Sequence, residues 1–247
     1  MATSRGGLVA ILIAVIFAGL TAIALQGDFH YFGVSQVSFE FDLKLIFSII
    51  VCGVAGGLLG GLFGQSLITG SRLIGPWLRD YPLRVAFVLG LLIALIGHLS
   101  GHSSFGTGYQ AAYGIVTGIS EFDPMYSVYK FFATMASYFT GIPGGIFAPS
   151  LATGADFGMD LAHYLPLAPV SFMVMVTMVA YFSGVIQAPI TAAVIVLEMT
   201  SNQNMIFPLM ISGFIGYGMS TLVCPRSLFR VLAEAYLHSD GMQQGQA

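Results

Sequence analysis

The chain has 247 residues, of which 56% are hydrophobic and only 8% are charged, and its mean hydropathy is +0.87. A soluble domain keeps about 25% charged residues to hold its surface in water, so this composition excludes a soluble fold and indicates a polytopic membrane protein in a lipid bilayer. A net charge of -3 provides no basic surface, which excludes nucleic acid as a partner.

Apolar segments follow one another along the chain and predict a single all-α transmembrane domain over residues 1–247, with about nine or ten helices and no appended cytosolic domain. Several segments are shorter than the about 20 residues that cross a bilayer, so we expect tilted and broken helices. The segments are 8–25, 43–74, 85–98, 128–140, 146–164, 170–184, 188–199 and 206–223.

Basic residues suggest an orientation in the membrane. Arg72, Arg79 and Arg84 fall in one expected loop, and two more arginines lie near the C-terminus, whereas the segment 27–42 is acidic and has no Lys or Arg. Because positive charge is enriched in cytoplasmic loops, we expect the arginine loop and the C-terminus to be cytoplasmic and the 27–42 loop to lie outside.

The glycine-rich turn 141–150 interrupts the apolar pattern and opens the next helix. The first N–H groups of a helix have no partner within the helix and carry partial positive charge, so they can hold an anion without a full opposing charge. The amides of Gly145, Ile146 and Phe147 could therefore bind a chloride-type ion weakly and reversibly. The alternative is a glycine-rich junction that only packs tightly.

Two motifs decide between these interpretations. Residues 144–151 read Gly-Gly-Ile-Phe-Ala-Pro-Ser-Leu, and residues 187–200 contain Ala-Pro-Ile-Thr followed by Leu-Glu-Met-Thr. Together they resemble the second of the two inverted-topology halves of CLC-type chloride channels and chloride/proton antiporters. The resemblance implies transmembrane transport of chloride-like anions, with Gly144, Gly145, Ile146 and Phe147 at the anion site. It also implies a homodimer in the bacterial inner membrane, and neither a metal nor a cofactor.

The sequence also departs from the family pattern. The family places a tyrosine, whose hydroxyl contacts the anion, where Phe229 stands here. The family's Gly-Ser-Gly-x-Pro turn and its Gly-Arg/Lys-Glu-Gly-Pro turn, both in the first half, do not occur in this sequence. Either the sequence is a fragment of a longer gene product, or a separate chain supplies the first half. The alternative is a non-transporting remnant or assembly subunit that lacks the first-half gate.

Three polar residues stand out within apolar segments. Asp156 and Asp160 are four residues apart and so share a helix face, either at the aqueous interface or as a proton relay. Gln187 is expected to hydrogen-bond a neighbouring helix. No paired nucleophile and base of an intramembrane protease occurs in the sequence, so we expect no enzyme activity.

Overall fold

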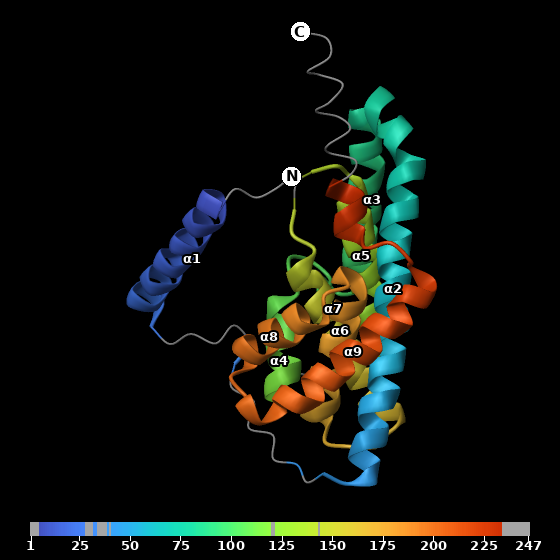
Figure 1. Cartoon of the computed structure of the whole chain (residues 1–247). Coiled ribbons are helices and arrows are strands. Elements are labelled where there is room, and N and C mark those ends of the chain that lie inside the picture. The colour runs from blue at the N-terminus through green and yellow to red at the C-terminus, as the bar shows by residue number, and fades with distance from the viewer. Residues whose placement is uncertain are drawn as a thin grey trace.

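The computed structural model describes residues 5–27, 32–33, 39, 41–119, 122–142 and 144–233, and all regular structure in these ranges is helical (Figure 1). The predicted all-α membrane class is confirmed. The helices are α1 (Arg5–Gln26), α2 (Leu43–Asp80), α3 (Pro82–Leu99), α4 (Tyr109–Thr117), α5 (Tyr126–Phe139), α6 (Phe147–Tyr164), α7 (Val170–Ile186), α8 (Pro189–Thr200) and α9 (Ile206–Val223), with a 3-10 turn at Gln203–Met205.

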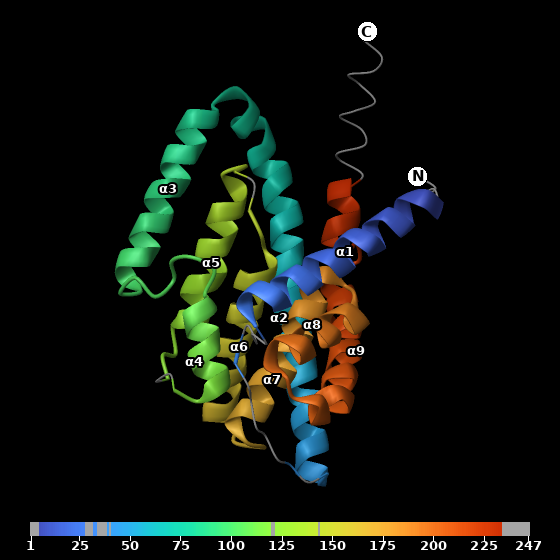
Figure 2. The same ribbon diagram turned by 90° about the vertical axis from the view of Figure 1, so that its left-hand side faces the viewer.

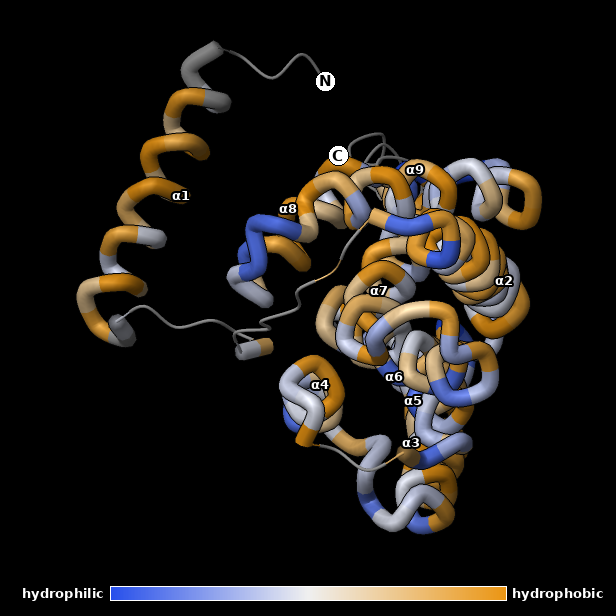
Figure 3. The backbone as a smooth tube through the Cα atoms, turned by 90° about the horizontal axis from the view of Figure 1, so that it is seen from below, coloured by the Kyte–Doolittle hydropathy of each residue, from blue (hydrophilic) through white to orange (hydrophobic). Residues whose placement is uncertain are grey.

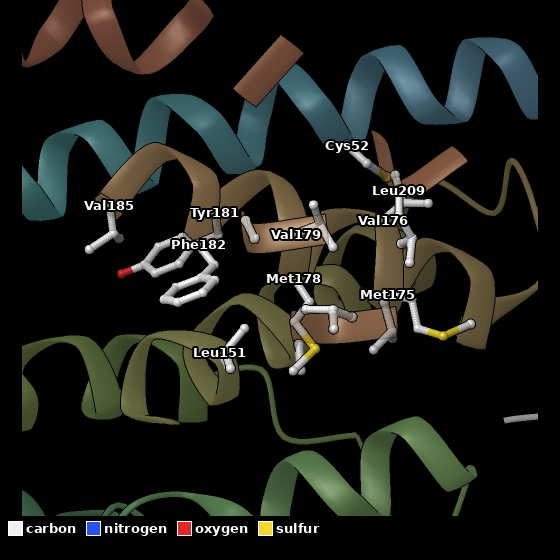
Figure 4. Close-up of a cluster of buried hydrophobic side chains, with 14 of the residues drawn as sticks. Cys52, Leu151, Met175, Val176, Met178, Val179, Tyr181, Phe182, Val185 and Leu209 are labelled. Atoms are coloured by element: carbon white, nitrogen blue, oxygen red, sulfur yellow. The ribbon is translucent and has the colours of Figure 1, made fainter. Parts of the chain in front are cut away.

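Helix α7 is the centre of the molecule. Every residue from Phe172 to Ile186 is buried, and α2, α6, α8 and α9 all pack against this helix. Figure 4 shows its side chains meeting Cys52 of α2, Leu151 of α6 and Leu209 of α9. A helix that is apolar on every side is typical of a position surrounded by protein.

Glycines bring the backbones of α2, α7 and α9 into direct contact. A Cβ added at Gly57 of α2 would lie 2.5 Å from the Gly216 carbonyl of α9, and one added at Gly216 would lie 2.5 Å from the Ala180 carbonyl of α7. Small residues allow this close approach, and close packing drives helix association where lipid removes the hydrophobic difference between helix and solvent.

Serine hydroxyls add hydrogen bonds across the α7–α9 contact. Such bonds between membrane helices contribute about 0.6 kcal/mol each on average. The Ser183 hydroxyl donates to the Gly213 carbonyl (2.8 Å), the Ser212 hydroxyl to the Val176 carbonyl (2.7 Å) and the Ser220 hydroxyl to the Gly184 carbonyl (2.6 Å).

The outer helices expose apolar surface. Helix α1 stands apart from the helical body in Figures 1 and 3 and crosses in front of it in the view of Figure 2. Figure 3 also shows apolar residues along most of its length. Helix α3 is largely exposed, with Leu83, Phe87 and Leu91 among its uncovered side chains. By length and composition, α2, α3 and the segment Gln203–Val223 could each cross a bilayer, and lipid covers such surfaces in a membrane.

The structure corrects the expected arginine loop. Helix α2 continues through Pro76 to Asp80, so Arg72 and Arg79 are helical, and Arg84 lies in the first turn of α3. Only Tyr81 separates the two helices, and the Arg84 guanidinium lies 4.9 Å from the centre of its ring. The expected outer loop 27–42 lies largely outside the described residues, as do Pro143 and the chain after residue 233.

Candidate functional site

The connection between α5 and α6 interrupts the helical body where the sequence predicts it. Helix α5 ends at Phe139, Thr140 closes its last turn, and Gly141 turns the chain with a φ of 76° that favours glycine. The Thr140 hydroxyl donates to the Ser137 carbonyl (2.7 Å) and accepts from the Ile142 amide (3.3 Å). These bonds hold the turn that leads to α6.

Helix α6 begins at Phe147 without a side-chain cap. Ile146 is the N-cap residue, and its side chain offers no hydrogen-bond acceptor. The first intrahelical bond at this end runs from the Ser150 amide to the Ile146 carbonyl (3.1 Å). The amides of Phe147 and Ala148 therefore point out of the helix end, where the helix dipole places partial positive charge, whereas Pro149 has no N–H.

Packing does not explain the glycines before this helix. Among the residues that the structure describes, a Cβ added at Gly145 would meet nothing within 4 Å, and one added at Gly144 would meet only the Ile142 carbonyl, at 3.9 Å. Neither glycine has a positive φ, unlike Gly141. The tightly packed junction considered as the alternative is therefore wrong for these two positions, and what the glycines provide is an uncovered backbone.

A cavity with both polar and apolar lining residues lies beside the uncovered backbone. It has a volume of about 130 Å³ and is lined by Gly144, Gly145, Ile146 and Pro149 from the α6 end, and by polar residues of α5 that include Thr134 and Ser137. Three of the predicted anion-site residues, Gly144, Gly145 and Ile146, thus line one cavity. Small anions fit a space of this size, since one water occupies about 30 Å³ of liquid volume.

Lys130 lines the same cavity and was not predicted as a site residue. Its side chain is 1% exposed, and its ammonium donates to the carbonyls of Ser104 (2.9 Å) and Gly106 (2.6 Å). The signal in the sequence is that Lys130 is the single basic residue of the apolar segment 128–140. Ionisable residues in such segments mark functional positions by default.

Phe147 and Phe229, far apart in the sequence, meet at the start of α6. Their rings are 5.7 Å apart at 90°, and the Phe147 ring also meets Phe182 of α7 at 5.1 Å. Phe229 lies in a short helical stretch, 228–233, and is 40% exposed. The structure therefore brings all five predicted anion-site residues to the same helix end, Phe229 through its ring contact alone.

A helical body with a broken helix that exposes its N-terminus to a cavity defines a polytopic helical membrane protein of the channel and transporter type. The chain belongs to the voltage gated chloride channel family, whose model matches residues 2–221. The resemblance noted in the two motifs is thereby confirmed at the level of the family.

Curated relatives and solved structures agree with this assignment. The chain is 26% identical over 251 residues to the H(+)/Cl(-) exchange transporter ClcA of Vibrio cholerae, covering 95% of this chain and 52% of that protein. It is 26% identical over 216 residues to ClcA of Yersinia pestis, covering 82% of this chain and 44% of that protein. The chain thus spans about half the length of the curated relatives it matches.

The fold is similar to two solved antiporters. A CLC-type fluoride/proton antiporter aligns with a TM-score of 0.71 at 20% identity, over 81% of this chain and 49% of that one. A slow cyanobacterial Cl-/H+ antiporter aligns with a TM-score of 0.69 at 22% identity, over 83% of this chain and 50% of that one. These alignments establish the fold.

Proposed function

We propose that the chain carries one side of a pathway for chloride-like anions across the lipid bilayer. The observation that carries the proposal is the uncapped α6 end, where Gly144 and Gly145 keep the backbone open toward a cavity that Lys130 also lines. Partial charges of helix amides bind an anion loosely enough for it to leave again, as conduction requires.

Lys130 strengthens the electrostatic case. A buried ammonium is unfavourable in a low-dielectric site unless hydrogen-bond acceptors or a counter-charge stabilise it, and ionisable residues in membrane segments are functional candidates by default. Two of its three N–H donors are held by loop carbonyls, so its charge stays fixed beside the cavity. A fixed positive charge raises the local concentration of anions.

The relatives named as H(+)/Cl(-) exchange transporters support chloride as the ion and transport, not catalysis, as the activity. Two further parts of the proposal rest on the resemblance: the chain works as a homodimer, and a first half completes the pathway. The same basis supports the bacterial inner membrane as location, with the C-terminus in the cytoplasm. The open glycines and the cavity favour transport over a remnant without a pathway.

Chloride efflux from liposomes tests the proposal, with chloride binding measured by calorimetry beside it. Gly145→Leu places a side chain where a Cβ meets nothing within 4 Å, so it covers the amides with little strain in the fold. Gly90→Leu is the matched control, because a Cβ at Gly90 of α3 also meets nothing within 4 Å and Gly90 does not line the cavity. We expect both flux and binding to fall at least about tenfold in Gly145→Leu only, since about 1.4 kcal/mol corresponds to tenfold.

A proline at position 147 would be a less specific test. It would remove one amide, yet Ile146 has φ -101° and ψ -11°, a conformation that a following proline disfavours.

Equal chloride binding in the wild type, Gly145→Leu and Gly90→Leu would contradict the proposed site.

A further inference from the structure

A second set of ionisable groups lies between α5 and α6, away from the cavity. Asp156 and Asp160 lie one helical turn apart on α6, and Asp156 is only 3% exposed while Asp160 is half-buried. The N-terminal turn of α5, with Tyr126 and Ser127, packs against them. Ser127 is 6% exposed and Tyr126 is 3% exposed.

Ser127 connects the two carboxyl groups. Its hydroxyl donates to Oδ2 of Asp160 at 2.9 Å, and its backbone amide hydrogen-bonds Asp156. One residue thus holds both acids in register across the α5–α6 contact.

The second oxygen of each acid is buried and has no hydrogen-bond partner among the described groups: Oδ2 of Asp156 and Oδ1 of Asp160. The Tyr126 hydroxyl is buried and unpartnered in the same way, and it interacts electrostatically with Asp156. Unpartnered oxygens at such depth are unfavourable. A proton bound to one of the two acids would neutralise the charge on its unpartnered oxygen.

The charges around the pair are mostly of the same sign. Asp123, at the exposed start of this region, adds a third carboxyl group within electrostatic range of both acids, and the exposed His163 lies near Asp160. Lys130 is directed to the loop carbonyls, and the described residues contain no group of three ligands suited to a metal. Two adjacent carboxylates in a low-dielectric site repel each other unless one of them is neutralised.

We propose that Asp156 and Asp160 form a proton-binding site, bridged by Ser127 and loaded from the surface at Asp123 and His163. One proton is transferred from a hydronium ion at the surface, which leaves a water molecule behind, to Asp160 and is held as an O–H bond on the pair, whose net charge falls from two negative charges to one. No oxidant or further reactant takes part. The Tyr126 hydroxyl, in the first turn of α5, interacts electrostatically with Asp156.

The site has a consequence for the anion, and this consequence rests on the proposed function. Phe147 and Asp156 are nine residues apart on α6, a rise of about 14 Å at 1.5 Å per residue. Over that distance, with an effective dielectric constant of about 20, one added negative charge lowers anion affinity at the helix start by about sevenfold. Proton loading of the pair therefore favours anion binding.

Infrared difference spectroscopy of the full chain in liposomes tests the proton site without any need for transport. At neutral pH we expect the carbonyl band of a protonated carboxyl group, lost at high pH and absent in Asp156→Asn and Asp160→Asn. Asp156→Glu should restore it. Glu198→Gln is the matched control, because Glu198 is an exposed carboxylate near the end of α8, and the band should persist in it.

Three results would overturn the proposal: no such band in the wild type at neutral pH, a band that survives in both Asn variants, or a band that sodium ions remove at constant pH. Chloride titrations at neutral and at high pH test the coupling between the proton site and the anion site. We expect the chloride affinity to differ about sevenfold between the two pH values in the wild type and not to differ in Asp156→Asn. A chain that binds no chloride but keeps the Asp156-dependent band would refute the proposed function and still support the proton site.

Discussion

The contact of α9 with α7 predicts that Gly216→Ala, which adds a single methyl group, lowers the free energy of unfolding substantially. Gly216 lies midway between Ser212 and Ser220, four residues from each. A Cβ at Gly216 would stand 2.5 Å from the Ala180 carbonyl oxygen and 2.8 Å from the Ala180 Cα. Both neighbours are backbone atoms, which cannot rotate away, so Gly216→Ala must separate the two helices.

The size of the effect follows from that geometry. Ordinary contact begins at 3.4 Å, so the helices must part by 3.4 − 2.5 = 0.9 Å at this point. The serine bonds of 2.7 Å and 2.6 Å on either side would lengthen toward the limit of hydrogen bonding. Overpacking costs about 2 kcal/mol and each membrane serine bond about 0.6 kcal/mol, which gives a loss of about 3 kcal/mol in the free energy of unfolding.

The assay is unfolding by sodium dodecyl sulfate in mixed micelles, followed by circular dichroism. Gly218→Ala is the matched control two residues along α9, because a Cβ there meets nothing within 4 Å and the position is exposed. We expect this control to change the free energy of unfolding by between zero and about 1 kcal/mol in the stabilising direction. Equal effects of the two substitutions would refute the backbone contact.

Three further substitutions test the site and its support. Lys130→Met removes the fixed charge of the cavity and the donor of two loop carbonyls, so we expect about 2 kcal/mol lower stability and weaker chloride binding by calorimetry; unchanged binding would exclude Lys130 from the site. Phe229→Tyr adds a hydroxyl near the α6 end and should tighten chloride binding about tenfold, whereas Phe214→Tyr on exposed α9 surface should not; no difference between the two would place Phe229 outside the anion site. Gln187→Leu removes a 2.6 Å bond to the Cys224 carbonyl and should cost about 1 kcal/mol in the same unfolding assay, and an unchanged midpoint would refute that estimate.

The apolar helical segments and the breaks between them could be predicted from the sequence. The segment 206–223 coincides with α9, and the breaks before 147 and 189 lie where glycine and proline interrupt the pattern. The expected hydrogen bond of Gln187 to a neighbouring helix is confirmed by its bond to the Cys224 carbonyl beyond α9. These features are local, because a chain in lipid must satisfy its backbone within each segment.

Features that depend on tertiary contact were missed. Helix α4 has only nine residues and contains a glycine and polar side chains, so it lacks the apolar run that marks the longer helices. Pro76 was expected to fall in a loop and is helical within α2. The place of Lys130 depends on carbonyls of Ser104 and Gly106, more than twenty residues earlier. No local pattern encodes such a partner.

The burial of α7 from Phe172 to Ile186 also bears on how the protein is made. Its 17 residues span about 26 Å at 1.5 Å per residue, slightly less than the about 30 Å of a bilayer core. Helix α9, which covers one side of α7, is synthesised later. Until α9 arrives, that side of α7 is open to lipid. Because its surface is largely apolar, α7 can remain in the bilayer before α9 is inserted. The glycines and serines of α9 then pack against α7 and displace the lipid.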